Sequence, residues 1–292
     1  MKITTTRWCL FAAVIALLGA PMVVRAAGPG GPPRDVTDTP AGRRLVSEAA
    51  ERHAALGARG GQARLRAWRI APGEFVVADA LPANFATTTR TLPDGKVAVD
   101  IRFDTEPLQV RQTAAATASP RWVQTGGTCF SRIGNTWGFV DSCYKTHRLS
   151  GETDYYWDYF QLEQYGSVGA KQGGKIYDGW MRGYRGGSAK MYWVDWSPRG
   201  TLTGGCVTVP ISVSAMGIGI SATGLMCERW DIFKSATGGD LKERWGCGCI
   251  IPFGQPYPNV REIDLMQAVK VLRNATPVWT LTAGLTALAG AG

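Results

Sequence analysis

The chain has 292 residues, with 32 Lys and Arg against 23 Asp and Glu, which gives a formal net charge of +9. The basic residues are spread along the chain without a run, and this argues against a nucleic-acid-binding surface. Only two histidines are present, and neither an HExxH nor a GxSxG motif occurs, so we expect no metal centre, no cofactor and no serine-hydrolase elbow.

The first 26 residues have the features of a signal peptide. A basic start precedes the apolar run Cys9–Leu18, and Val24 and Ala26 supply the small residues of a cleavage site after Ala26. Removing residues 1–26 takes away three basic residues and lowers the net charge from +9 to +6. No later apolar run reaches the ~20 residues that a membrane-spanning helix needs. We therefore expect a secreted, extracellular protein without a transmembrane span.

Residues 27–111 are predicted to form a small α+β segment, which is a candidate pro-region. Its helix begins after the capping residue Thr39, has Pro40 in its first turn and ends before Gly57. Short apolar runs between residues 65 and 103, separated by Pro-Gly and Asp-Gly turns, indicate strands.

A change in composition marks the larger part of the chain. The stretch 112–120, QTAAATASP, is predicted to be a linker. Residues 121–260 then hold 22 of the chain's 29 Phe, Trp and Tyr residues. We expect a separable, aromatic-rich β domain at residues 121–282, followed by a disordered Ala/Gly-rich tail at residues 283–292.

Strand-forming runs recur about every ten residues in this domain, with glycine-rich turns and no helix between them. This spacing predicts a mainly β fold, an antiparallel β-sandwich or barrel with disulfide staples. Residues 261–272 also fit a helical period, although their valines favour a strand. The expected strands are Tyr155–Tyr165, Lys175–Tyr184, Ala189–Trp196, Met266–Leu272 and Val278–Leu281.

Residues 206–227 alternate apolar and small polar side chains, which predicts a β-hairpin that turns at residues 216–217. A slip by one residue would place serines opposite valines, so the pattern sets the register. The pairs expected on the apolar face are Val207–Met226, Val209–Gly224, Ile211–Ala222, Val213–Ile220 and Ala215–Ile218.

The six cysteines outside the signal peptide are better explained as disulfides than as zinc ligands, because the chain is exported. Two pairs flank hairpin-like segments. The third pair would close a small, strained ring, so other partners for its two cysteines stay open. The expected disulfides are Cys129–Cys143, Cys206–Cys227 and Cys247–Cys249.

A second hairpin is predicted over residues 175–196, with Tyr184 paired with Lys190. This register gathers aromatic and charged side chains on one face. Flat rings beside charged groups suit a ligand with apolar faces and polar edges, as sugars have; alternatively, the rings fill the core and only their polar atoms reach its rim. The predicted ligand-binding residues are Asp178, Trp180, Arg182, Tyr184, Tyr192 and Trp196.

These patterns predict a non-enzymatic protein that binds carbohydrate or another cell-surface polymer. One alternative is a glycoside hydrolase with paired carboxylates, for which Glu163 and Glu228 are candidates, although such acids also occur as solvated ion-pair partners. The other is membrane insertion by the hairpin at residues 206–227, whose disulfide and core-like face instead favour an ordinary hairpin. A nucleophile would depend on His147 as its base, and a lone histidine there is more typical of a strand residue.

Overall fold

The computed structural model describes residues 32–57, 64–107, 119–151, 154–199, 206–227, 230–234, 240–245 and 260–288, with backbone only at residues 206–209, 224–227, 230–234, 245 and 260–261. The expected signal peptide, the Cys247–Cys249 pair and Glu228 lie outside the described residues.

The described chain is mainly β, with sixteen strands in three antiparallel sheets and one helix. The eight-stranded sheet has the order β1 (Arg34–Asp35), β2 (Arg66–Ala71), β3 (Glu74–Ala78), β6 (Arg121–Gly134), β7 (Gly138–Ser150), β8 (Trp157–Ala170), β15 (Val260–Leu272) and β10 (Tyr192–Ser197). The six-stranded sheet has the order β13 (Trp230–Lys234), β14 (Leu241–Trp245), β9 (Lys175–Gly186), β16 (Val278–Leu288), β5 (Lys96–Asp104) and β4 (Ala86–Thr91). A two-stranded sheet contains β11 (Cys206–Ala215) and β12 (Ile218–Cys227). Neither larger sheet closes on itself.

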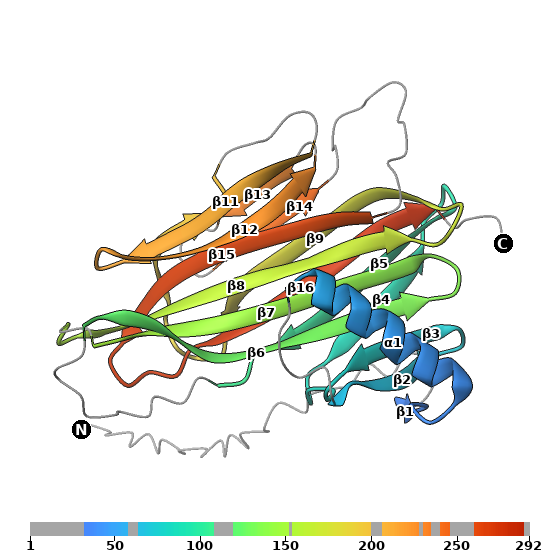
Figure 1. Cartoon of the computed structure of the whole chain (residues 1–292), viewed down its shortest axis with the longest axis horizontal. Helices are drawn as coiled ribbons and strands as arrows, with labels where there is room; N and C mark the ends of the chain where they lie inside the picture. The colour runs from blue at the N-terminus through green and yellow to red at the C-terminus, as the bar shows by residue number, and fades with distance from the viewer. Residues whose placement is uncertain are drawn as a thin grey trace, which may run out of the picture.

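The two larger sheets form two layers that share one hydrophobic core (Figure 1). Phe160 and Leu162 of β8 enter the core from one sheet, and Met181 of β9 and Leu281 of β16 enter it from the other. All four side chains are fully buried. The two-residue alternation that predicted strands is therefore the alternation between the core and the outer face of each sheet.

Strands from before and after the expected linker pair with one another. β3 is hydrogen-bonded to β6, and β5 lies between β4 and β16. Phe103 of β5 packs against Phe130 of β6, with ring centroids 4.1 Å apart in the shared core. The boundary expected at residues 112–120 therefore does not separate two cores. The aromatic content changes there, but the strand edges on each side need the other part of the chain as a hydrogen-bonding partner.

The last strand continues where a disordered tail was expected. β16 extends to Leu288 and pairs with β5 on one side and β9 on the other. Ala283, Leu285 and Ala287 are fully buried and alternate with Gly and Thr. The prediction of disorder from residue 283 is therefore wrong for residues 283–288. Alanine has a low strand propensity, but here it supplies the buried face of a central strand.

The aromatic stretch 175–196 forms two strands that do not pair with each other. β9 lies between β14 and β16 in the six-stranded sheet, whereas β10 pairs with β15 at the edge of the eight-stranded sheet. The predicted hairpin is therefore wrong. Alternation fixes the face that each residue occupies, but it does not select the neighbouring strand when several strands share the pattern.

The hairpin of β11 and β12 has the predicted register at all ten paired positions, and Cys206 lies opposite Cys227 in the backbone. Met216 and Gly217 form its turn with φ angles of 51° and 77°. Positive φ at both central residues is what a type I′ hairpin turn requires. The cysteine side chains are outside the described part, so the Cys206–Cys227 disulfide stays a prediction.

The described part of this hairpin's apolar face packs onto the eight-stranded sheet. Ile211 of β11 is fully buried and forms a cluster with Met266 of β15. At the hairpin tip, the Trp122 indole nitrogen donates a hydrogen bond to the Ile218 carbonyl at 3.0 Å. β15 is a strand over its whole length, so the alternative helix at residues 261–272 is excluded. The described apolar side chains that would enter a membrane are thus packed against the eight-stranded sheet within the fold.

Helix α1 (Pro40–Ala55) begins where the sequence predicted, because the Thr39 hydroxyl oxygen accepts a hydrogen bond from a first-turn N–H at 3.0 Å. The Cys129–Cys143 disulfide joins β6 to β7 and confirms one of the three expected bridges. No helix in the described ranges is long and apolar enough to cross a membrane.

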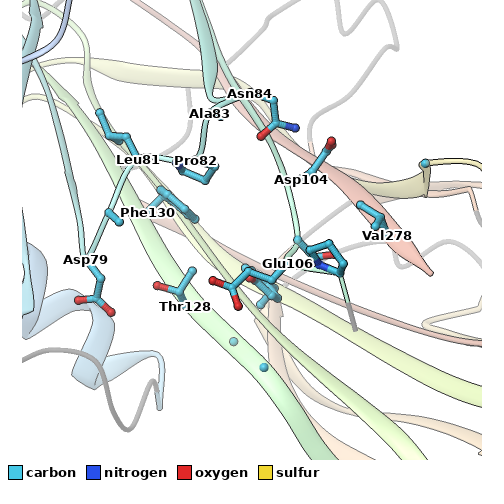
Figure 2. Close-up of a pocket in the computed structure, with 17 residues that line it drawn as sticks. Asp79, Leu81, Pro82, Ala83, Asn84, Asp104, Glu106, Thr128, Phe130 and Val278 are labelled. Atoms are coloured by element: carbon cyan, nitrogen blue, oxygen red, sulfur yellow. The ribbon is translucent and has the colours of Figure 1, made fainter. Parts of the chain in front are cut away.

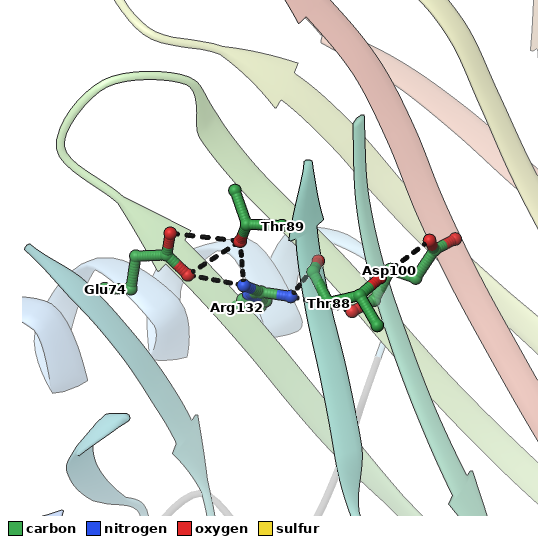
Figure 3. Close-up of polar contacts among 5 residues, drawn as sticks. All are labelled: Glu74, Thr88, Thr89, Asp100 and Arg132. Carbon is green, nitrogen blue, oxygen red and sulfur yellow. Dashed lines mark hydrogen bonds and ion pairs between the residues drawn. The ribbon is translucent and has the colours of Figure 1, made fainter. Parts of the chain in front are cut away.

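A buried arginine connects the two larger sheets (Figure 3). Arg132 of β6 is 2% exposed, and its guanidinium donates to the backbone carbonyls of Thr88 on β4 and Asp100 on β5, both at 2.7 Å. It also binds the carboxylate of Glu74 on β3 and the hydroxyl of Thr89 on β4. One side chain therefore links strands of both layers, and its buried charge has a half-buried counter-ion in Glu74.

Candidate functional site

Four of the six residues predicted to bind a ligand lie on one face of β9. Asp178, Trp180, Arg182 and Tyr184 are half-buried and alternate with fully buried positions such as Met181. Because Met181 points into the shared core, the four side chains lie on the outer face of the six-stranded sheet. The structure thus keeps them together and leaves them accessible.

Trp180 lies across a glycine of the neighbouring strand. Its partner on β16 is Gly284, and a Cβ atom at that position would lie 2.2 Å from Trp180 Cζ2 and 2.5 Å from Cε2. A larger residue at this position would push the indole ring away from the sheet. The ring therefore rests on Gly284, and because it is only half-buried, its other side faces away from the sheet.

Positive side chains surround the two rings. The guanidinium of Arg182 lies 4.6 Å from the Tyr184 ring centroid, and that of Arg102 on β5 lies 5.8 Å from the same ring. Lys242 of β14 places its ammonium 5.8 Å from the Trp180 ring centroid. We call the following residues the aromatic–cationic face: Trp180, Tyr184, Arg102, Arg182, Lys242 and Arg244.

Carboxylates pair with only some of these cations. In the described part of the chain, these cations form the ion pairs Arg182–Asp240 at 2.6 Å and Arg244–Asp178 at 2.9 Å. Burial raises the pKa of Asp178, and the hydrogen bond from Arg244 opposes that shift. Among the described residues, Arg102 and Lys242 have no ion-pair partner within 4.0 Å. The face therefore keeps positive charge that a ligand can use.

The other two predicted residues, Tyr192 and Trp196, lie on β10 in the eight-stranded sheet. Tyr192 is 42% exposed and packs edge-on against Trp157, with ring centroids 5.3 Å apart. Trp196 packs against the shared core and against Trp193, at 6.3 Å between centroids. The predicted hairpin over residues 175–196, which the structure does not form, would have put Tyr192 and Trp196 on the same face as the four β9 residues. Sequence reasoning also missed the cations of β5 and β14, because no local pattern links those strands to β9.

Glu163, one of the two predicted catalytic carboxylates, faces away from the shared core on β8. Its carboxylate lies 3.8 Å from the Lys145 ammonium, and the residue is 6% exposed. Asp264 of β15 lies diagonally beside it, because Asp264 pairs with Tyr165, two residues along β8. Asp264 is 9% exposed, and its Oδ1 atom has no hydrogen-bond partner in the described structure. Within the described residues, Asp264 is thus a carboxyl neighbour of Glu163. Glu228, the partner that the sequence predicted, lies outside the described residues.

Burial raises the pKa of both groups of this carboxyl pair, Glu163 and Asp264. The Glu163 charge raises the pKa of Asp264 further, whereas the Lys145 charge opposes the rise at Glu163. Two neighbouring carboxyl groups in a desolvated setting avoid carrying two charges. The two groups therefore resist being ionised together, and the Lys145 charge favours the ionised form of Glu163.

Both histidines form side-chain hydrogen bonds within the fold. His147 Nδ1 lies 2.6 Å from Gln161 Oε1, and His53 Nε2 lies 2.8 Å from Ser131 Oγ. Burial lowers the pKa of both histidines. In the described ranges, one group of three possible metal ligands lies within 4.8 Å, namely His53 with the Cys129–Cys143 disulfide. Because these two sulfurs are bonded to each other, they offer no thiolate to a metal ion.

Comparisons with known proteins do not assign this site. No protein-family model matches the chain, and no curated protein matches its sequence.

Proposed function

We propose that the protein is a secreted, non-enzymatic binding protein whose aromatic–cationic face recognises an acidic polysaccharide. The observation that carries this proposal is the half-buried Trp180 ring, which rests on Gly284 between positive side chains. A sugar ring can place its apolar side against such a ring. Carboxylate or sulfate groups of the polymer then accept charge-assisted hydrogen bonds from arginine and lysine.

Charge and location agree with this proposal. Arg102 and Lys242, which have no carboxylate partner among the described residues, favour an acidic polymer over a neutral one. The signal-peptide pattern at residues 1–26 and the Cys129–Cys143 disulfide suit an extracellular, oxidising location. In this proposal the two layers form a β-sandwich, whose stiff central strands hold the face without rearrangement.

Retention of the mature protein on immobilised polygalacturonate tests the proposal, with neutral dextran as the reference polymer. Trp180→Ala should weaken binding at least about tenfold, because loss of an aromatic anchor from the centre of a contact costs about 2 kcal/mol or more. Tyr192→Ala is the matched control, since it removes an exposed ring from the other sheet. Equal losses in the two variants, or equal retention on dextran, would contradict the proposal.

Glycoside hydrolysis is a second candidate function, favoured by the carboxyl pair. Two buried carboxyl groups with raised pKa values on neighbouring strands are the groups that such a reaction uses. Asp264 would hold the proton as general acid, and Glu163 beside Lys145 would act as the ionised carboxylate. In this account Asp264 replaces Glu228 as the partner of Glu163.

Release of reducing ends separates the two functions. A hydrolase should release them from a polysaccharide that it binds, and both Glu163→Gln and Asp264→Asn should abolish the release. A binding protein should retain the polymer without releasing any. Release that persists in both variants would exclude the carboxyl pair as the catalytic site.

A further inference from the structure

A cavity of about 770 Å³ lies where β3, β5 and β9 end, beside β6 and β7 (Figure 2). Its wall includes the loop at residues 79–84, residues 104–107 and part of β6. Small-molecule sites usually measure about 300–1,000 Å³, so the cavity has room for a ligand. None of the described residues that line it belongs to the aromatic–cationic face or to the carboxyl pair.

One wall of the cavity is aromatic and firmly packed. Phe130 and Tyr144 line it and are 2% and 6% exposed. The Phe130 ring packs against Phe103 at 4.1 Å and against Phe85 at 5.8 Å between centroids. These rings support one another from behind, so the wall is preformed and offers an apolar surface to a ligand.

The charged side chains among the described lining residues are all acidic. Asp79, Asp104 and Glu106 contribute carboxyl groups, and no Lys, Arg or His belongs to the described part of the lining, although the whole chain has a net charge of +9. In Figure 2 the carboxyl groups of Asp79 and Glu106 lie on either side of Thr128. A cleft with charges of one sign attracts ligands of the opposite sign and repels sugar acids and phosphates.

Asp79 provides a second, independent indication of a ligand. Its Oδ1 atom is buried and has no hydrogen-bond partner in the described structure. By contrast, Asp104 Oδ1 accepts a hydrogen bond from the Thr280 hydroxyl at 2.6 Å. Burial raises the pKa of Asp79, and Arg64 opposes this shift. Buried acceptors are normally satisfied, and an N–H group of a bound ligand would satisfy this one.

We infer that the cavity binds an organic cation. Its ammonium or guanidinium group is held between Asp79 and Glu106, and its apolar body lies against Phe130 and Tyr144. This class of ligand is favoured by the size of the cavity, by its aromatic wall, by the acidic charge of its described lining residues and by the unsatisfied acceptor of Asp79. The site does not depend on the proposed recognition of polysaccharide.

Calorimetric titration of the mature protein with 1,6-diaminohexane tests the inference, and 1,6-hexanediol serves as the uncharged probe of the same length. We expect saturable binding of the diamine, with a Kd of about 1 mM or tighter, and none of the diol. Asp79→Asn and Glu106→Gln should each weaken diamine binding about tenfold or more, because each removes a charged hydrogen-bond partner. The exposed Asp94 provides the matched control, and Asp94→Asn should leave the Kd unchanged.

A second variant covers the possibility that the acidic substitutions disturb folding. Leu81→Lys places a tethered ammonium at the cavity wall, where it should occupy the acidic groups and block the diamine. The absence of saturable diamine binding in the parent would overturn the inference. So would equal binding of the diol, a loss with Asp94→Asn as large as with Glu106→Gln, or unchanged binding in Leu81→Lys.

Discussion

The outer faces of the two larger sheets differ in the burial and the pairing of their charged side chains. On the aromatic–cationic face, the side chains of Arg182 and Arg244 are 38% and 41% exposed and lie beside carboxylates. On the eight-stranded sheet, Glu163 and Asp264 are less than a tenth exposed and lie beside each other. Exposed pairs are screened by water and exchange partners at little cost, whereas buried like charges change each other's protonation. One face is therefore suited to reversible binding and the other to holding a proton.

The largest expected effect is on the free energy of unfolding, when a buried arginine and an exposed arginine are each replaced by methionine. Arg132→Met removes a buried guanidinium and leaves the half-buried Glu74 carboxylate with the Thr89 hydroxyl; because loss of one member of a fully buried pair costs about 3–5 kcal/mol, we expect a cost of about 3 kcal/mol. Arg182→Met breaks a pair whose arginine side chain is 38% exposed and should cost about 1 kcal/mol or less. Urea unfolding of both variants measures the difference, and similar losses of stability would show that burial does not distinguish the two sites.

The next largest difference in stability is expected between two tryptophan-to-alanine variants. Trp196 packs against the shared core, so Trp196→Ala should lower the free energy of unfolding by about 2–3 kcal/mol. Trp180 rests on the outer face, so Trp180→Ala should cost about 1 kcal/mol and mainly reduce binding. Thermal unfolding compares the two variants. A greater loss of stability with Trp180→Ala would mean that its ring is a structural element rather than a contact for ligand.

A buried carboxyl group, that of Glu243, should have a smaller and pH-dependent effect on the free energy of unfolding. Burial raises the pKa of Glu243 on β14 well above 4.5, and the charge on Asp264 adds to this. Between that ordinary value and the raised one, the folded state binds more protons than the unfolded state, so stability falls as pH increases. Glu243→Met should therefore stabilise the protein at pH 8 by about 1 kcal/mol and have less effect at pH 4.

The difference between variant and parent is the quantity to measure, because other groups titrate in the opposite sense. His53 and His147 have lowered pKa values, so their contribution grows as pH rises toward 6.5. Subtracting the parent profile of unfolding free energy against pH removes this contribution. A difference that does not change from pH 4 to pH 8 would mean that Glu243 has the same pKa in both states.

Local patterns predicted the local parts of the fold. The register of β11 with β12 follows from alternation within one continuous stretch, and the turn at Met216 and Gly217 closes it. The start of α1 follows from the Thr39 cap. The Cys129–Cys143 bridge follows from two cysteines that flank a short hairpin. In each case the interacting groups are near in sequence, so the pattern leaves few alternatives.

Contacts between distant strands could not be predicted in the same way. β9 and β10 are neighbours in sequence and alternate alike, yet they belong to different sheets. The aromatic–cationic face combines β9 with Arg102 of β5 and Lys242 of β14, which are about 60 or more residues away. Four of the six residues predicted to bind a ligand lie on one face because Asp178, Trp180, Arg182 and Tyr184 share one strand, and alternation alone fixes the face of a strand that each residue occupies.

Backbone hydrogen exchange in the presence of an oligogalacturonate tests the central claim most directly. If the aromatic–cationic face binds the polymer, exchange should slow in β9 and β14 when the ligand saturates the protein, while β10 at the edge of the other sheet is unaffected. At that concentration the same ligand should slow exchange less in Trp180→Ala than in the parent, because the variant binds at least about tenfold more weakly. Protection confined to β10 and β15, or to residues 79–84, would place the polymer elsewhere and contradict the account.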